Sequence, residues 1–261
     1  MLDLTTIKKR FAGSIKTYDE HALVQKHVAV KLAKFIQNTL STIPERILEV
    51  GCGTGLLTHQ LSCSYPDAHY YLNDINGQIE TILPKILPNV RYDFLPGDAQ
   101  HKEWPTELDL VVSASTLQWF ADPCRFFQSI KQALSPHGYF IFSTFGETNL
   151  QEITAITGKG LYYPSPEQLK AWLNAEFIVL EQQEETIQLI FDTPLQVLNH
   201  LKYTGVNAGF NVIKNKTQLT HFCKTYEAWF SMMPGVTLTY HPIYFIAQLR
   251  PHYPALPCAK R

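Results

Sequence analysis

One carboxylate and three glycines come together where an apolar segment ends in a turn. Residues Ile47 to Gly55 are Ile-Leu-Glu-Val-Gly-Cys-Gly-Thr-Gly, and Glu49 stands two residues before the first glycine. A dinucleotide-binding turn spaces its glycines G-x-G-x-x-G around a pyrophosphate, but here Leu56 occupies the position of the last glycine. A carboxylate repels a pyrophosphate and attracts a cation. The turn therefore favours S-adenosylmethionine, which carries an ammonium group and a sulfonium group but no phosphate.

Further residues complete this predicted cofactor site. Asp74 ends an apolar segment 25 residues after Glu49, where its carboxylate is placed to accept both ribose hydroxyls; capping the next helix is the alternative. Asp98 and Ala99 follow the next apolar segment in a Pro-Gly-Asp turn and suit the amino group of an adenine. The predicted cofactor-binding residues are Glu49, Gly51, Gly53, Gly55, Asp74, Ile75, Asp98, Ala99 and Ser113.

An aromatic pair follows a fourth apolar segment. Ser113 to Phe120 reads Ser-Ala-Ser-Thr-Leu-Gln-Trp-Phe. Beside a reactive sulfonium, Trp119 and Phe120 would keep water away from the methyl group. The plainer interpretation is that both rings are core residues, because large aromatic side chains are mostly buried.

Strands that alternate with helices are expected to position these residues. Strand-like segments are expected at 46–50, 69–74, 90–94, 108–115 and 138–145. Helical segments are expected at 18–41, 56–65, 78–87 and 123–134. This alternation predicts an α/β fold with a parallel, Rossmann-like sheet, whose ligands bind at the carboxyl ends of the strands.

The pattern changes after Gly146. Helices are expected at 149–156, 166–174, 194–203 and 217–232, with extended runs at 177–191 and 236–249. We therefore expect a helical lid at 1–45, a cofactor-binding core at 46–192, a helical cap or insert at 193–234 for substrate and carrier, and a final strand segment at 235–261 that completes the core.

Composition excludes several classes of protein. With 261 residues, 45% hydrophobic content and a formal net charge of −1, the chain is globular and has no overall bias toward nucleic acid. It shows neither a signal peptide nor an apolar run long enough to span a membrane. Five cysteines without a C-x-x-C pair suit a reducing cytoplasm, and the ten histidines show no metal-binding spacing.

Local charge is uneven. Between Thr193 and Tyr226 there is no acidic residue but four lysines, Lys202, Lys214, Lys216 and Lys224. The first 34 residues also carry an excess of basic side chains. Such runs are commonly solvated helix faces; the alternative is a surface that attracts an acidic carrier.

Several stretches together resemble one family, the malonyl-acyl-carrier-protein O-methyltransferases of biotin synthesis, within the class I methyltransferases that use S-adenosylmethionine. These stretches are Ile7 to Phe11, Thr17 to Ala22 with Gln25, Leu48 to Gly55, Thr116 to Phe120, Ser143 to Gly146 with Leu150 to Glu152, and Leu201 to Asn207. After Phe145 and Gly146 the chain departs from the family pattern, because Glu147, Thr148 and Asn149 stand where proline and an acid are usual.

The resemblance implies a seven-stranded, mostly parallel sheet with an inserted helical cap. It also implies methylation of the free carboxylate of a malonyl group on acyl carrier protein or another thioester. An ionised carboxylate is itself the nucleophile, so the site has to align it rather than deprotonate it. The residues expected to do so are Tyr18, Lys202, Phe145 and Thr144, with Arg10 as a second possible cation. The alternative is a methyltransferase of a free small molecule such as a quinone precursor or a dicarboxylate.

Overall fold

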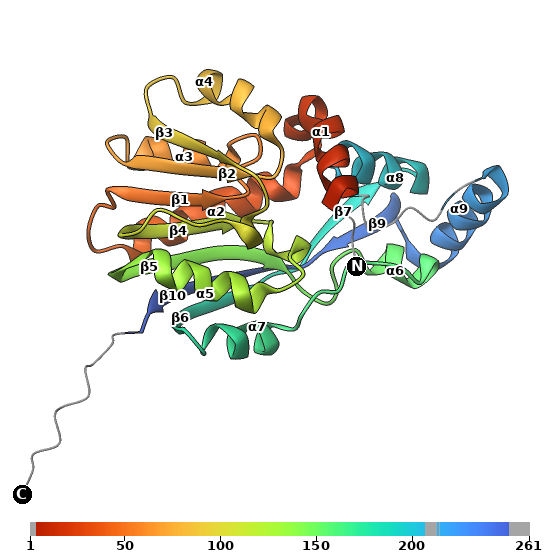
Figure 1. Cartoon of the computed structure of the whole chain (residues 1–261). Helices are drawn as coiled ribbons and strands as arrows, with labels where there is room; N and C mark the ends of the chain where they lie inside the picture. Colours follow the sequence, from red (N-terminus) through yellow and green to blue (C-terminus); the bar gives the residue numbers. More distant parts are fainter. Residues whose placement is uncertain (1–3, 207–212, 214, 251–261) are drawn as a thin grey trace, which may run out of the picture.

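A seven-stranded sheet forms the centre of the molecule (Figure 1). The structure, a computed structural model, describes residues 4–206, 213 and 215–250. The strands lie in the order β3 (Arg91–Pro96), β2 (His69–Asp74), β1 (Arg46–Val50), β4 (Leu108–Ala114), β5 (Leu134–Phe145), β10 (Pro242–Leu249) and β6 (Phe177–Glu184). Strands β1 to β5 pair in parallel, and β10 is antiparallel to both of its neighbours. The predicted Rossmann-like, mostly parallel sheet is confirmed.

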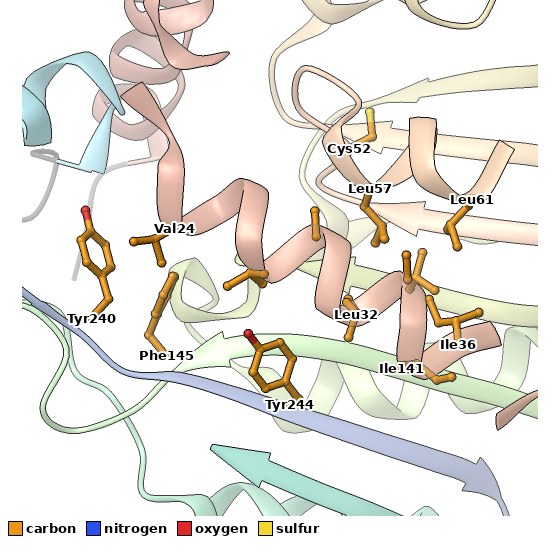
Figure 2. Close-up of a cluster of buried hydrophobic side chains, with 14 of the residues drawn as sticks. Val24, Leu32, Ile36, Cys52, Leu57, Leu61, Ile141, Phe145, Tyr240 and Tyr244 are labelled. Carbon is orange, nitrogen blue, oxygen red and sulfur yellow. The ribbon is translucent and has the colours of Figure 1, made fainter. Parts of the chain in front are cut away.

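Side-chain alternation along the strands gives the sheet two apolar faces. On β1, Ile47 belongs to one buried cluster and Leu48 to the other, and on β5 Ile141 and Phe142 divide in the same way. Helices α2 (Leu23–Thr39) and α3 (Leu56–Ser64) cover the first face, and Figure 2 shows Leu32, Ile36 and Leu61 among the side chains of this buried cluster. Helices α5 (Pro123–Ala133) and α7 (Pro166–Leu173) cover the second.

A smaller sheet extends the far edge of the large one. Strand β6 continues through a short break into β7 (Ile187–Phe191), and β9 (Gly235–Tyr240) leads through His241 into β10. The smaller sheet has the order β7-β9-β8, where β8 is Ser231–Met232. Three helices pack around it, α6 (Gln151–Thr157), α8 (Pro194–Tyr203) and α9 (Lys216–Phe230). The remaining elements are α1 (Leu4–His21), α4 (Leu83–Ile86) and the single turns η1 (Gly77–Thr81), η2 (Ala99–His101) and η3 (Leu117–Trp119).

The structure corrects three of the expected elements. The helix expected at 18–41 is wrong, because the chain forms two helices that meet at Ala22, whose φ of −79° and ψ of 52° are not helical. Hydrogen bonds from Ala22 N to Tyr18 O and from Lys26 N to Ala22 O keep both helix ends paired across the break. The runs expected at 177–191 and 236–249 each divide between the two sheets.

Some expected features lie outside the described residues. They are Asn207 of the resemblance, Lys214 of the basic segment, the first three residues of the expected lid and residues 251–261 of the expected final segment.

Candidate functional site

The glycine turn joins β1 to α3, and a different structural reason favours glycine at each of its three glycine positions. Gly51, Gly53 and Gly55 adopt φ angles of +75°, +51° and +80°, which L-residues with a Cβ rarely adopt. A Cβ on Gly51 would lie 2.1 Å from Thr116 Oγ1, so this glycine permits close packing of two loops. A Cβ on Gly53 would meet nothing within 4 Å. Gly53 therefore leaves space beside the backbone where a ligand can approach.

That space belongs to a first cavity at the carboxyl ends of the parallel strands. The space inside it, counted out to open solvent, is about 890 Å³. It collects side chains from the ends of β1, β2, β3 and β4 and from helix α1. The predicted residues that line it are Tyr18, Gly51, Gly53, Asp74, Ile75, Asp98 and Ala99.

Two carboxylates of this cavity are fixed by backbone N–H groups. Asp74 accepts from Gly53 N through Oδ2 at 2.9 Å and from Asn76 N through Oδ1 at 2.8 Å. Burial is the main cause that raises the pKa of Asp74. Burial alone would raise the pKa of Asp98 too, but hydrogen bonds from Gln100 N and His101 outweigh it and lower that pKa. Both side chains thus have one geometry before any ligand arrives.

Glu49 lies behind the glycine turn rather than in the cavity wall. It is 1% exposed and accepts a hydrogen bond from Thr58 Oγ1 at 2.7 Å. Burial raises its pKa to about 8, against the lowering effect of that hydrogen bond, and the charge of Asp74 raises it further. Glu49 is therefore largely protonated at neutral pH without a ligand, and a cation placed near it would favour its ionised form.

Two other predicted residues support the turn from behind. Ser113 is buried and donates from Oγ to Val50 O at 2.9 Å. Gly55 begins helix α3 in a left-handed conformation, and a Cβ there would lie 3.1 Å from Ile86 Cγ2. Neither residue lines the first cavity.

Helix α1 closes one side of the cavity. Thr54 Oγ1 donates to Asp19 Oδ1 at 2.6 Å, which fastens the end of the helix to the glycine turn. Phe11 meets Trp119 edge to face, with their ring centroids 5.4 Å apart. Trp119 and Phe120 both line the cavity, in agreement with the aromatic wall expected from the sequence.

A second cavity adjoins the first. The space inside it, counted out to open solvent, is about 360 Å³, and it shares with the first cavity Phe11, Tyr18, Ser115 and Trp119. Its other walls come from α2 and η3, from the loops after β5, α6 and α8, and from β9. Figure 2 shows two of its residues, Phe145 and Tyr240, side by side at the end of the core. Two ligands with adjoining reactive groups can be held by this pair of cavities.

The four residues expected to act on the acceptor occupy different places. Tyr18 lines both cavities, and Phe145 lines the second. Thr144 is buried and donates from Oγ1 to Gln118 Oε1 at 3.4 Å, so it lies behind the wall. Lys202 is exposed on α8 and lines neither cavity, and Arg10 lines neither cavity either. The structure brings Tyr18 and Phe145 together but not the two cations.

Several residues of the first cavity were not expected from the sequence, and three of them have polar side chains with informative contacts. Asn76 is 2% exposed, and its Nδ2 has no hydrogen-bond partner in the described structure. Gln100 Oε1 accepts from the backbone N–H groups of Ala121 and Asp122, which ties the turn after β3 to the loop after η3. The third is Thr54, the partner of Asp19. Thr54 stands inside the glycine motif, and Asn76 follows Asp74 by two residues, a spacing that suits a turn, but neither pattern gives the contacts that the two side chains make.

The first cavity fits S-adenosylmethionine on its own chemistry. It offers open space beside Gly53, carboxylates at Asp74 and Asp98, and an unpartnered buried donor at Asn76. Within the described residues, no group of three His, Cys, Asp or Glu side chains is arranged to hold a metal ion. No helix of the described chain is long and apolar enough to cross a membrane.

Comparison with known proteins agrees with this geometry. Residues 48–142 match the family model described as a methyltransferase domain. A malonyl-acyl-carrier-protein O-methyltransferase of Haemophilus ducreyi is 42% identical over 91% of this chain and 93% of its own length. A protein of the same name from Bacteroides fragilis is also 42% identical, over 94% of this chain, and the chain spans 50% of its length.

A solved structure supports the fold independently. The N-methyltransferase NodS of Bradyrhizobium japonicum, in complex with S-adenosylhomocysteine, has a TM-score of 0.52 at 12% identity and covers 85% of each chain. Taken with the relatives that match almost end to end, the chain belongs to the malonyl-acyl-carrier-protein O-methyltransferase family and is an S-adenosylmethionine-dependent methyltransferase.

Proposed function

We propose that this chain methylates the free carboxylate of a malonyl group carried on acyl carrier protein, an early step of biotin synthesis. The observation that carries the proposal is the second cavity, which adjoins the first at Tyr18, Phe11 and Trp119. This second cavity is the smaller of the two and is lined by residues of several different elements, so it suits a short acyl group better than a folded macromolecule. The relatives' name supplies the identity of that acyl group.

We assign roles in the first cavity by chemistry. Asp74 would bind the ribose hydroxyls, with Asn76 as a donor beside it, and Asp98 would accept from the adenine amino group. Ile75 and Ala99 would contact the faces of the base. Glu49, Gly51 and Gly53 would hold the methionine end, while Gly55 and Ser113 support the turn.

Methyl transfer requires that the reacting groups are aligned and that water is excluded from the site. S-adenosylmethionine supplies a methyl group on a positively charged sulfur; its transfer to a carboxylate oxygen forms an O–C bond, breaks a C–S bond and requires no proton transfer. Tyr18 stands where the two cavities meet and would orient the acceptor. Phe145 would pack against the acyl group, and Phe11 and Trp119 would exclude water from the junction.

Basic helix faces provide a docking surface for an acidic carrier. Lys8 and Lys9 are exposed on α1, Lys202 on α8, and Lys216 at the start of α9. We propose that these lysines contact the carrier rather than the malonyl carboxylate. We propose that the chain is divided into a lid at 1–45, a core at 46–192, a cap at 193–234 and a segment from 235 that completes the core. We expect the reaction to take place in the cytoplasm and to involve no nucleic acid.

A direct assay tests the proposal. Purified protein and methyl-labelled S-adenosylmethionine are incubated with malonyl-acyl carrier protein, with malonyl-pantetheine, and with free malonate or a quinone precursor. We expect mass spectrometry to show one added methyl group on the malonyl carrier, with a higher KM for malonyl-pantetheine. Methylation of the free small molecules alone would refute the proposal and support the alternative of a small-molecule methyltransferase.

A further inference from the structure

The second cavity contains no cationic side chain among the described residues, although its proposed ligand is an anion. Every polar side chain that lines it is neutral in type: three phenols, three amides and two hydroxyls. The polar residues are Tyr18, Tyr163, Tyr240, Gln25, Gln118, Asn149, Ser115 and Thr204. The basic residues expected from the sequence, Lys202 and Arg10, lie elsewhere.

Gln25 is the most unusual member of this wall. It lies in the first turn of α2 and is 6% exposed, yet its Oε1 has no hydrogen-bond partner in the described structure. A buried amide oxygen without a partner is costly, so native proteins rarely leave one without a reason. Rotation of the amide exchanges its oxygen and its N–H₂ group, and the choice between them follows the partner that is present. The Gln25 amide can therefore turn its N–H₂ group toward a bound ligand and donate a hydrogen bond to it.

Tyr18 provides a second free donor. No hydrogen bond to its hydroxyl is found in the described part of the chain, and the residue lines both cavities. Burial, and then the charges of Asp19 and Asp74, raise its pKa, so the hydroxyl keeps its proton. A protonated phenol can donate to a carboxylate oxygen but cannot neutralise its charge.

The only imidazole bonded to this wall is neutral as well, within the described structure. His200 Nε2 and Tyr240 Oη are 2.8 Å apart. Burial, followed by the charge of His21, lowers the pKa of His200 to about 4. The charged groups that act on Tyr18 are both carboxylates. An acceptor carboxylate thus enters a site whose own field is negative.

We propose that the acceptor carboxylate is held by the Tyr18 hydroxyl and the Gln25 amide, and that its counter-charge is the positive charge in the first cavity rather than any side chain of the second. This inference rests on the proposed function. The carboxylate oxygen donates an electron pair to the methyl carbon, the C–S pair returns to sulfur, and one negative and one positive charge disappear. A fixed cation beside the carboxylate would stabilise it before the reaction more than in the transition state, where its charge is fading, and would slow the step. Neutral donors orient the carboxylate with less of this cost.

Binding in the absence of turnover tests the source of the counter-charge. The affinity of malonyl-pantetheine is measured by calorimetry with the first cavity occupied by S-adenosylhomocysteine or by sinefungin, an analogue with an ammonium group near the position of the sulfonium. Opposite charges about 4 Å apart in a partly buried site attract strongly, so we expect at least about tenfold tighter binding with sinefungin. The methyl ester of malonyl-pantetheine is uncharged at that end, and its affinity should differ by less than about twofold. Equal affinities of malonyl-pantetheine for the two complexes overturn the inference.

A pair of matched substitutions on α2 tests the role of Gln25. Gln25→Glu places a like charge against the acceptor, whereas Gln37→Glu makes the same change at an exposed site of the same helix, where Gln37 Nε2 bonds Ser64 Oγ. We expect Gln25→Glu to weaken binding of malonyl-pantetheine by at least about tenfold and binding of its methyl ester by less than about threefold. Gln37→Glu should change neither.

The variant Gln25→Met removes the donor but keeps the size of the side chain. It is a control that separates the loss of the donor from misfolding. It should raise KM for malonyl-pantetheine while the melting temperature and the affinity for S-adenosylhomocysteine stay near those of the wild type. Equal weakening of acid and ester by Gln25→Glu, or an unchanged KM for Gln25→Met, overturns the role of Gln25. If malonyl-pantetheine is neither bound nor methylated by the wild type, the proposed function itself has failed, whereas intact methylation without charge dependence refutes only this inference.

Discussion

Glu49 gives the sharpest link between function and stability in this chain. Its carboxyl group lies in β1, almost wholly buried, with Thr58 Oγ1 as its hydrogen-bond donor. Burial first, and the charge of Asp74 in addition, raise its pKa from the ordinary 4.5 to about 8. We predict that Glu49→Gln stabilises the ligand-free protein at pH 8 and weakens its binding of S-adenosylmethionine.

The direction follows from proton binding in the two states. Between pH 4.5 and about 8 the folded state holds a proton on Glu49 that the unfolded chain releases. Stability contributed by this group is therefore fully present below pH 4.5 and decreases as the pH rises toward 8. One pKa unit is equivalent to about 1.4 kcal/mol, so the loss is at most about 5 kcal/mol. The neutral amide introduced by Glu49→Gln lacks this dependence, and its oxygen can still accept from Thr58 Oγ1.

Urea unfolding of the ligand-free proteins at pH 5 and pH 8 measures the effect. We expect Glu49→Gln to exceed the wild type by about 1–4 kcal/mol at pH 8, with a much smaller difference at pH 5. Glu152 supplies a matched control, because it is another buried carboxylate but accepts from both Thr239 N and Thr239 Oγ1. In Glu152→Gln the amide can accept from Thr239 N and donate to Thr239 Oγ1, but the charged acceptor is lost and the hydroxyl has to reorient, so the change should destabilise by about 1–3 kcal/mol. A Glu49→Gln protein that is less stable than the wild type at pH 8 would refute the reasoning.

Binding of the cofactor should show the opposite dependence on pH. A cation near Glu49 favours the ionised carboxylate, so the affinity for S-adenosylmethionine should rise with pH up to about 8 and release a proton in doing so. Calorimetry in two buffers of different ionisation enthalpy counts that proton. Glu49→Gln should abolish both the slope and the proton release, and a slope that persists in the variant would assign the linkage to another group.

The remaining predictions concern the glycine turn, the junction of the cavities and the basic surface. Gly51→Ala forces a Cβ to within 2.1 Å of Thr116 Oγ1 and should lower the free energy of unfolding in urea by about 2–4 kcal/mol. Gly53 has a similar φ but lies in open space, so Gly53→Ala should lower that free energy by only about 1 kcal/mol. The same change should weaken cofactor binding, measured by calorimetry, about tenfold. Tyr18→Phe should lower kcat by about 10- to 100-fold while the Kd for S-adenosylhomocysteine changes little, and an unaltered kcat would remove Tyr18 from the acceptor site. Lys202→Glu should raise KM for the malonyl carrier at low salt about tenfold but not that for malonyl-pantetheine, since the side chain is exposed outside both cavities.

The parts of the fold that were predicted correctly are those that depend on the order of polar and apolar residues within one segment. The segment His69–Asp74 was expected and found with the same bounds, because apolar residues fill both faces of a buried parallel strand. The break at Ala22 was missed because neither proline nor glycine marks it. The divided strands at 177–191 and 236–249 were missed because the pairing partners, and not the local residues, decide which sheet each half joins.

The residues of the candidate site were likewise predicted only in part from the sequence. Asp74 and Asp98 could be placed from the sequence, because residues that follow parallel strands gather at one edge of the sheet. Lys202 stood in a family-like stretch, but its turn of α8 faces away from both cavities, and a sequence pattern alone does not give that rotation. Gln25 and Asn76 were not assigned roles because their significance lies in an atom without a partner, which only packing reveals.

Helix α1 explains how the two substrates are coupled. Phe11 and Tyr18 from this one helix line both cavities, and Asp19 fastens the helix to the glycine turn through Thr54. At the same end His21 stacks on Tyr203 of α8, with ring centroids 4.5 Å apart. A change in the position of α1 would therefore alter both cavities. Because the second cavity lacks a described cation and we propose that the acceptor's counter-charge comes from the first cavity, we predict that the cofactor binds before the acceptor.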